Sequence, residues 1–445
     1  MPKITHRKKR LSSFKLIVLG FAGVIVLGAL ILMLPFSSTA GVVTPFHEAL
    51  FTSTSAVCVT GLVVQDTGSY WSAFGQAVIL LLIQIGGLGV VTVAATFAML
   101  SGRKISLMQR STMQDAISAP KVGGIVRLTR FIVRGTFLIE LIGMIVMLPT
   151  FCGNYGIKGI WMAAFHSVSA FCNAGFDILG TAENKYPSLT GYIGNPAINI
   201  TIMLLIIVGG IGFLTWDDIY TNKWHFKKYR MQSKVILVTT AILIIAPAVF
   251  FFFCDFTGLP LAERILASLF QSVTPRTAGF NTADLPAMTG SSKAIMTLLM
   301  LVGGSPGSTA GGMKTTTLAV LILSAFSVCR KKDDAEVCGR RIDGSVVKNA
   351  AAVAVMYFLL FFVGGIVIST AEGLPLSTCL YETASAVGTV GLTLGITPQL
   401  GVLSQLILIV LMYLGRVGGL TLIYAAISNK NQSGAKLPLE KITVG

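Results

Sequence analysis

Residues 376–392 read LSTCLYETASAVGTVGL, whose first part is an apolar segment of about 12 residues, well short of the ~20 that a helix needs to cross a bilayer. Three further stretches have the same form, at residues 46–62, 161–176 and 261–280. The glycines near their ends recur at intervals of 114, 104 and 112 residues, and each is followed by Leu or Phe: Gly61, Gly175, Gly279 and Gly391. This period is far above that of solenoid repeats and predicts four copies of one larger unit.

The composition indicates that this chain is solvated by lipid. Of its 445 residues, 53% are hydrophobic and 12% are charged, which excludes an ordinary soluble globular protein. Eight apolar runs long enough to span a bilayer begin near Phe14, Phe74, Phe131, Ala197, Lys234, Ala294, Ala350 and Gly401. We therefore predict an all-α membrane protein with eight transmembrane helices and four re-entrant pore helices.

One short segment lies between the two spans of each pair, so the chain divides into four repeats of helix, pore loop and helix. The predicted repeats are residues 14–100, 130–215, 234–325 and 348–427, with tails at 1–13 and 428–445. Because each repeat has an even number of spans, all four keep one orientation. They can surround a pseudo-fourfold axis along the membrane normal, unlike inverted repeats.

The basic residues predict how the chain is oriented. Of 34 Lys and Arg, 27 lie on the side that holds both termini and the segments 103–134, 223–234 and 330–348, and five lie on the other side. The positive-inside rule therefore places both termini in the cytoplasm. The net charge of +16 is spread over segments that face the membrane, which favours lipid over nucleic acid as a partner.

The four glycines have the chemistry of a cation pathway. Irregular backbone at membrane depth survives only where protein buries it or where it lines a wet cavity. Glycine reaches positive φ, which lets backbone carbonyls turn inward and replace the hydration shell of a cation. The short helices also direct their partly negative C-terminal ends toward that axis. The predicted filter is Val59, Thr60, Gly61, Asn173, Ala174, Gly175, Thr277, Ala278, Gly279, Thr389, Val390 and Gly391.

A second glycine pattern follows each filter position. Clusters begin at Gly86, Gly209, Gly303 and Gly415, and three of them lie 24 or 25 residues past the filter glycine. The second lies 34 residues past it. The polar segment 177–195, with its Gly, Pro and Asn turn residues, accounts for the difference as an extracellular insertion.

The third cluster interrupts the sixth span. Residues 303–312 read GGSPGSTAGG, a run of weak helix formers that predicts a loop at membrane depth, just below the filter. A simple helix kink is the alternative. A nucleotide-binding P-loop is excluded because Met313 separates Gly312 from Lys314 and no strand precedes the run.

The fourth filter segment carries a resemblance to known proteins. Residues 389–392, TVGL, read like the start of a potassium-channel filter, with Leu where Tyr-Gly would follow. Four degenerate repeats with one filter glycine each, joined in one chain, resemble the Trk/Ktr/HKT superfamily. In length the chain is similar to the KtrB membrane subunits of bacterial Ktr potassium-uptake systems. The resemblance covers roughly residues 14–427 and implies channel-like conduction of K+, bound at Gly61, Gly175, Gly279 and Gly391, in a bacterial plasma membrane.

The same resemblance bears on selectivity and coupling. In that family a Ser in place of the first filter glycine goes with sodium transport, so Gly61 favours potassium. The residues that flank the glycines differ among the repeats, which favours looser selectivity than in a potassium channel. A Na+-coupled or H+-coupled K+ symporter, or a Na+-permeable cation transporter, on the same fold is the alternative function.

The resemblance also implies a gate. In that family the matching loop closes the pore and an Arg in the last span contacts it. The implied gate residues are Gly303, Gly304, Ser305, Pro306, Gly307, Ser308, Thr309, Ala310, Gly311, Gly312 and Arg416. A charge within a span costs at least about 2.5 kcal/mol, so Arg416 needs a partner. The loop carbonyls are one candidate, and Glu140, in a packing role, is the other.

The implied partners are a second copy of the chain and a cytosolic, KtrA-like nucleotide-binding ring. The ring would carry the ATP, ADP or NAD site, since this chain shows no cofactor motif, and Na+ is expected as an activating ion. Segments 103–134 and 429–445 are the candidate docking surfaces, with attraction to anionic lipid as the alternative.

No enzyme site is predicted. His47 and Glu48 begin like a zinc-protease helix, but the second His of that motif is absent and the chain has four His in all. No Ser/His/Asp set or carboxylate pair stands out either. We expect Arg276 and Glu382 to anchor their segments rather than to bind the transported ion.

Overall fold

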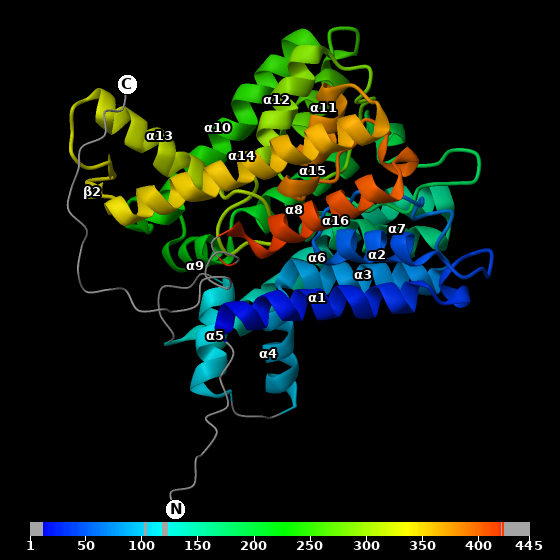
Figure 1. Ribbon diagram of the computed structural model, residues 1–445, viewed down its shortest axis with the longest axis horizontal. Helices are drawn as coiled ribbons and strands as arrows, with labels where there is room; N and C mark the ends of the chain where they lie inside the picture. Colours follow the sequence, from blue (N-terminus) through cyan, green and yellow to red (C-terminus); the bar gives the residue numbers. More distant parts are fainter. Residues whose placement is uncertain (1–11, 102–104, 118–122, 420, 422–445) are drawn as a thin grey trace, which may run out of the picture.

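The computed structural model of the protein describes residues 12–101, 105–117, 123–419 and 421. These residues are helical apart from turns, loops and one small antiparallel hairpin, β1 (Glu336–Val337) with β2 (Arg340–Arg341). Several helices, α1, α3 and α14 among them, run along the long axis of the molecule (Figure 1). The helices are α1 (Ser13–Leu32), α2 (Phe46–Val57), α3 (Ala73–Leu88), α4 (Val90–Leu100), α5 (Leu107–Ile117), α6 (Ile125–Tyr155), α7 (Lys158–Phe171), α8 (Pro196–Gly210), α9 (Phe213–Asn222), α10 (Met231–Cys254), α11 (Leu261–Val273), α12 (Gly290–Leu301), α13 (Thr315–Cys329), α14 (Gly344–Glu372), α15 (Leu376–Gly388) and α16 (Val402–Val417).

The number of spans that length and composition support is smaller than the sequence predicts. In the described part of the chain, four helices are long and apolar enough to cross a membrane, namely α1, α6, α10 and α14. Two bent pairs bring the number to six: α3 and α4 meet at 95°, and α8 and α9 at 98°. The other two predicted spans coincide with α12 and α13, which a loop separates, and with α16.

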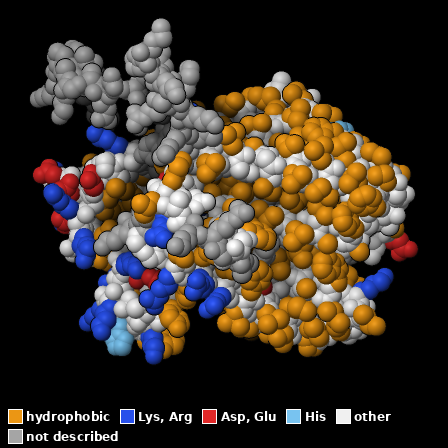
Figure 2. All heavy atoms as spheres, turned by 90° about the horizontal axis from the view of Figure 1, so that it is seen from below, with side chains coloured by type: hydrophobic (Ala, Val, Ile, Leu, Met, Phe, Trp, Pro, Cys, Tyr) orange, Lys and Arg blue, Asp and Glu red, His pale blue; other side chains and the backbone are white. Residues whose placement is uncertain are grey.

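The outward flanks of the long helices are apolar. Leu27, Leu138, Phe253 and Phe358, on α1, α6, α10 and α14, are each more than half exposed. Figure 2 shows a broad hydrophobic surface, with Lys and Arg gathered at the end where Figure 1 places α9 and β2. Water would oppose this exposure by roughly 25 cal/mol per Å² of apolar surface, whereas lipid does not. The surface is that of a membrane protein.

Each short segment predicted from the sequence is a helix, and it packs against the long helix that precedes it. The pairs are α2 with α1, α7 with α6, α11 with α10, and α15 with α14. A hydroxyl of each short helix donates to a backbone carbonyl of the long one. The four bonds are Ser53 Oγ to Ile25 O (2.7 Å), Ser167 Oγ to Glu140 O (2.6 Å), Ser272 Oγ to Ile244 O, and Thr383 Oγ1 to Phe361 O (3.1 Å).

Glycines on α1 and α6 make room for two of these hydroxyls. A Cβ on Gly28 or Gly143 would lie within 3.0 Å of the hydroxyl of Ser53 or Ser167. Real Cβ atoms do not approach so closely, so a larger residue would push the short helix away. These contacts hold α2 and α7 in place along their partner helices.

Candidate functional site

The segments that follow the short helices share one backbone conformation. Both the filter glycine and the residue two positions before it have positive φ in every repeat. The glycines are Gly61 (93°), Gly175 (68°), Gly279 (81°) and Gly391 (95°), and the preceding residues are Val59 (51°), Asn173 (58°), Thr277 (71°) and Thr389 (52°). Left-handed Val and Thr are strained, at a cost of about 1–3 kcal/mol each. Strain at this position in three repeats, with Asn173 in the same conformation in the second repeat, indicates a functional constraint.

The four filter glycines close a ring in chain order. A Cβ built on each glycine would lie within 3.0 Å of a carbonyl oxygen of the next repeat, that of the residue directly before the filter glycine there. The glycine of the fourth repeat makes this contact with the first repeat, which closes the ring. The contacts are Gly61 with Ala174 O, Gly175 with Ala278 O, Gly279 with Val390 O, and Gly391 with Thr60 O. No side chain fits at any of these positions without moving backbone. The structure thus brings all four sequence-predicted segments together.

Hydroxyl groups of the short helices hold the filter backbone. Ser55 Oγ accepts from Gly61 N at 3.1 Å, and Ser385 Oγ accepts from Gly391 N at 3.0 Å. In the second repeat Ser169 Oγ instead donates to Phe176 O at 2.7 Å. These bonds join three of the short helices, α2, α7 and α15, to the irregular backbone that follows them, in a region that is fully buried.

The glycine clusters lie where the second helix of a repeat meets the end of its short helix. The first glycine of a cluster packs against a backbone carbonyl there, and the glycine three residues later has positive φ. The packing contacts are Gly86 with Val57 O, Gly209 with Phe171 O, and Gly415 with Val387 O. The left-handed glycines are Gly89 (84°), Gly212 (92°) and Gly418 (86°). Close approach and a sharp turn both require glycine, which explains why the pattern recurs.

The third cluster forms the loop that the sequence predicts. α12 ends at Leu301 and α13 begins at Thr315, so residues 303–312 lie outside helices. Backbone hydrogen bonds tie this loop to the helix breaks of other repeats. They run from Ser305 N to Gly210 O (2.9 Å), Thr309 N to Gly209 O (3.2 Å), Phe213 N to Gly307 O (2.7 Å) and Gly312 N to Gly415 O (3.2 Å).

The loop lies between the filter and an inner cavity. A Cβ on Gly311 would lie within 3.0 Å of the Thr389 side chain, so the loop contacts the fourth filter segment. On its other side Gly307 lies against Ile117 O at the end of α5. The inner cavity has a volume of about 230 Å³, and its lining includes the loop, Lys314 and Arg416.

Arg416 contacts the loop directly. Its Nη1 donates to Thr309 O, and its Nη2 donates to Gly86 O and, at 3.2 Å, to Gly87 O. The alternative partner, Glu140, accepts from Gln84 Nε2 at 3.4 Å, and the ion pairs among the described residues do not join it to Arg416. The charge of Arg416 is therefore met by backbone carbonyls of two repeats.

Lys314 is a second cation on the loop, and the sequence analysis missed its role. Its Nζ donates to Ala310 O at 2.7 Å and to Gly311 O at 3.4 Å. The available signal is a Lys two residues past a glycine-rich run, inside an otherwise apolar segment. Two positive side chains thus hold adjacent carbonyls of the loop.

The residues expected to anchor their segments make contacts within their own repeats. Glu382 on α15 accepts from Leu394 N at 3.1 Å and from Thr397 Oγ1 at 2.9 Å, which joins the short helix to the chain after the filter. Arg276 Nη2 donates to Thr240 Oγ1 at 3.4 Å.

In the described part of the chain, no group of three or more His, Cys, Asp or Glu could hold a metal ion.

Comparison with known proteins places these features in a family. The family model described as "TrkH: Cation transport protein" matches residues 13–434. The Potassium/sodium uptake protein NtpJ of Enterococcus hirae is 39% identical over 98% of this chain and 98% of its own length. The Ktr system potassium uptake protein B of Bacillus subtilis is 36% identical over 97% of this chain and 96% of its own. The crystal structure of the potassium transporter TrkH from Vibrio parahaemolyticus matches with a TM-score of 0.74 over 96% of this chain and 87% of that one, at 19% identity, which shows a shared fold.

Proposed function

The chain belongs to the TrkH family of cation transport proteins, and on this premise we propose that it is the ion-translocating subunit of a potassium-uptake system. The family is one of transporters rather than enzymes. Both relatives described above are named for potassium uptake, and they match nearly the whole chain. The observation that carries the proposal is the ring of four glycines closed in chain order, since a ring of backbone oxygens is the means by which proteins coordinate a dehydrated K+.

In the proposed filter each repeat contributes three residues, ending at Gly61, Gly175, Gly279 or Gly391, and K+ binds at the level of these glycines. Buried hydroxyls without a partner among the described residues, Thr60 Oγ1 and Thr389 Oγ1, support this assignment. A buried polar oxygen left unpaired costs about 1–3 kcal/mol, which a bound cation would offset.

The proposed architecture has four repeats with the predicted bounds, eight spans and four pore helices. α2, α7, α11 and α15 are the pore helices, and each second span is broken at its glycine cluster. The match in fold to a solved potassium transporter supports this assignment. We assign the basic end of the molecule, where α9 and β2 lie, to the cytoplasmic side (Figure 2). The positive-inside rule predicts that both termini are on that side as well.

The proposed gate is the loop 303–312 together with Arg416 and Lys314. The loop separates the filter from the inner cavity, and both cations bind its carbonyls. Each hydrogen bond to a charged group contributes about 1.5–3 kcal/mol, so these contacts stabilise a closed loop. Opening requires that at least some of them break.

The proposed assembly is a homodimer on a cytosolic, KtrA-like ring that binds ATP, ADP or NAD, with Na+ as an activating ion. The name of one relative, which refers to a Ktr system, supports a partner subunit. Of the candidate docking segments, residues 105–117 and 123–134 are described, whereas 103–104, 118–122 and the tail 429–445 lie outside the described residues. The tails 1–11 and 428–445 lie outside them as well.

A second candidate function is transport of Na+, either with K+ or in its place. No two repeats have the same pair of residues before the filter glycine, so the ring is not exactly fourfold. The name of the Enterococcus hirae relative includes sodium.

Complementation tests the proposal. A bacterial strain without its own K+ uptake, expressing this chain with a Ktr-type regulatory subunit, should grow at micromolar to low millimolar K+. Growth that needs high K+ despite normal membrane expression would contradict a role in potassium uptake. A need for Na+ at equal concentrations on both sides of the membrane would fit activation by Na+, whereas K+ uptake driven by an imposed Na+ gradient would favour the coupled alternative.

A further inference from the structure

An outer cavity opens directly above the filter. Its volume is about 230 Å³, and all four filter glycines line it together with Asp177. At ~30 Å³ per water, a cavity of this volume has room for roughly eight water molecules, enough for one monovalent cation with its first hydration shell. In the described residues that line it there is no Lys, Arg or His.

Asp66 is one of two carboxylates in the cavity lining, and its oxygens already accept hydrogen bonds from neighbouring residues. It accepts hydrogen bonds from Ser69 N at 2.8 Å, Ser69 Oγ at 2.7 Å and Tyr186 N at 3.0 Å, and it is 4% exposed. These donors occupy its oxygens and fix the turn after the first filter segment. Asp66 therefore has little capacity left for an ion.

Asp177 is placed differently. It lies two residues past Gly175, it is partly exposed, and its Oδ1 accepts from Leu179 N at 3.1 Å. The carboxylate thus faces the cavity while its backbone stays attached to the second filter segment. Burial, with a contribution from the nearby Asp66, raises the pKa of the Asp177 carboxyl to about 7, so the group carries its charge above neutral pH. Of the two acidic residues, Asp177 is the one that can meet an arriving cation.

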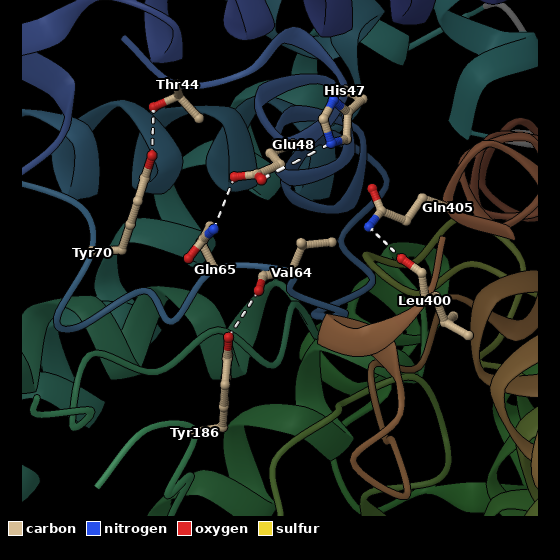
Figure 3. Close-up of polar contacts among 9 residues, drawn as sticks. All are labelled: Thr44, His47, Glu48, Val64, Gln65, Tyr70, Tyr186, Leu400 and Gln405. Carbon is tan, nitrogen blue, oxygen red and sulfur yellow. Dashed lines mark hydrogen bonds and ion pairs between the residues drawn. The ribbon is translucent and has the colours of Figure 1, made fainter. Parts of the chain in front are cut away.

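The insertion 177–195, which begins at Asp177, is fastened to two other repeats. Tyr186 Oη donates to Val64 O at 2.8 Å, as Figure 3 shows, so the insertion reaches the first repeat. Leu189 N donates to Asn281 O at 2.9 Å and Asn281 N donates to Ser188 Oγ at 3.0 Å, so it also reaches the third. Tyr186 and Ser188 line the cavity. The insertion therefore builds a fixed wall beside the filter.

We propose that the outer cavity is an entry site for a hydrated monovalent cation and that the carboxylate of Asp177 attracts the ion to it. The site rests on the proposed function, because it delivers ions to the filter. A carboxylate in a cleft with low-dielectric walls raises the local concentration of the opposite charge by about tenfold or more. The amide oxygen of Asn281, which also lines the cavity, supplies a neutral ligand for the hydration shell.

The test measures initial rates of K+ uptake against external K+ in cells that lack other uptake systems. Asp177→Asn keeps the shape and the acceptor for Leu179 N but removes the charge, so KM should rise about tenfold while the maximal rate changes less than about twofold. Asp177→Glu should restore most of the affinity. Glu183→Gln is the matched control, because Glu183 lies on the same insertion, is exposed and does not line the cavity.

The outcomes separate this site from the proposed function. Absence of K+ uptake by the unmodified chain, at normal expression, would overturn the proposed function itself. Uptake by the unmodified chain with an unchanged KM in Asp177→Asn, or an equal rise of KM in Glu183→Gln, would overturn the entry site alone. A lower maximal rate at unchanged KM would also overturn it, since that result indicates damage to the filter. If Asp177→Asn does not reach the membrane, Asp177→Ser takes its place, with the same expectations.

Discussion

Arg416 Nη1 donates a hydrogen bond to the backbone carbonyl of Thr309, which lies 107 residues earlier in the chain. The same guanidinium donates to Gly86 O and Gly87 O, so a side chain of the fourth repeat joins the loop of the third to the helix break of the first. A charge at this depth without partners costs at least about 2.5 kcal/mol. The position of the loop and the solvation of Arg416 therefore depend on each other.

Replacing Arg416 with Gln should raise K+ flux and weaken its regulation. Loss of charged hydrogen bonds worth about 1.5–3 kcal/mol each would free the loop, and about 1.4 kcal/mol already changes an open-to-closed ratio tenfold. The measurement is the maximal uptake rate at matched membrane expression. Arg264→Gln is the control, because Arg264 Nε also donates to a backbone carbonyl, that of Phe252 at 2.8 Å, but does so away from the loop.

A shortened loop should have the same effect as Arg416→Gln. Deleting residues within 303–312 removes the other side of the same contact, so the double variant should not exceed the larger single effect by much. Additive increases would indicate two separate barriers. Wild-type or lower flux in well-folded single variants would show that Arg416 serves packing and that the gate lies elsewhere.

Replacing Lys314 with Gln should also raise K+ flux, because Lys314 Nζ binds the neighbouring carbonyls of Ala310 and Gly311. We expect a smaller increase than for Arg416→Gln, since Lys314 contacts the loop alone and does not reach another repeat. Uptake rates of Lys314→Gln and of Lys314→Arg, which keeps the charge, provide the comparison. Equal rates in both variants would mean that the charge of Lys314 is irrelevant to the gate.

Sequence reasoning predicted the parts of the site that depend on glycine. Positive φ and close backbone approach both select against side chains, so Gly61, Gly391 and the clusters stand out in the sequence. The loop at 303–312 was recognisable for the same reason. The sequence also indicated that Arg416 needs a partner, but it left two candidates open.

The sequence did not indicate contacts whose acceptor is a backbone carbonyl. Lys314 to Ala310 O and Ser53 Oγ to Ile25 O are examples, because any residue type supplies the acceptor. The number of membrane spans is also difficult to predict from the sequence, because an apolar stretch does not show where its helix ends. Helix length is set by where the glycine clusters turn the chain, so second spans that are apolar throughout are divided into shorter helices.

Replacing Gly391 with Ser should raise the K+ concentration that uptake requires and reduce discrimination against Na+. A Cβ there collides with Thr60 O, and the ring must widen or shift. Gly373→Ser is the matched control, since Gly373 also has positive φ (67°) but its Cβ would meet nothing within 4 Å. Uptake kinetics and selectivity equal to those of the control would remove Gly391 from the filter.

Replacing Ser53 with Ala should lower stability without changing selectivity. The bond from Ser53 Oγ to Ile25 O at 2.7 Å is buried, and its loss should cost about 1 kcal/mol. Thermal unfolding in detergent measures the effect. Ser101→Ala is the control, because the Ser101 hydroxyl bonds within its own helix, to Phe97 O, and is exposed. An equal change in melting temperature for both variants would mean that the contact between α1 and α2 contributes nothing.

Ion flux into proteoliposomes that contain the purified protein tests the central claim most directly, with K+ and Na+ measured separately and no other ion gradient imposed. Both the unmodified chain and Arg416→Gln should be used, because the variant is expected to be open. If K+ passes through the ring of Gly61, Gly175, Gly279 and Gly391, it should flow down its own gradient and well in excess of Na+, and Gly391→Ser should reduce that preference. Equal Na+ flux, a strict need for a Na+ or H+ gradient, or a preference that survives in Gly391→Ser would contradict potassium conduction through this filter.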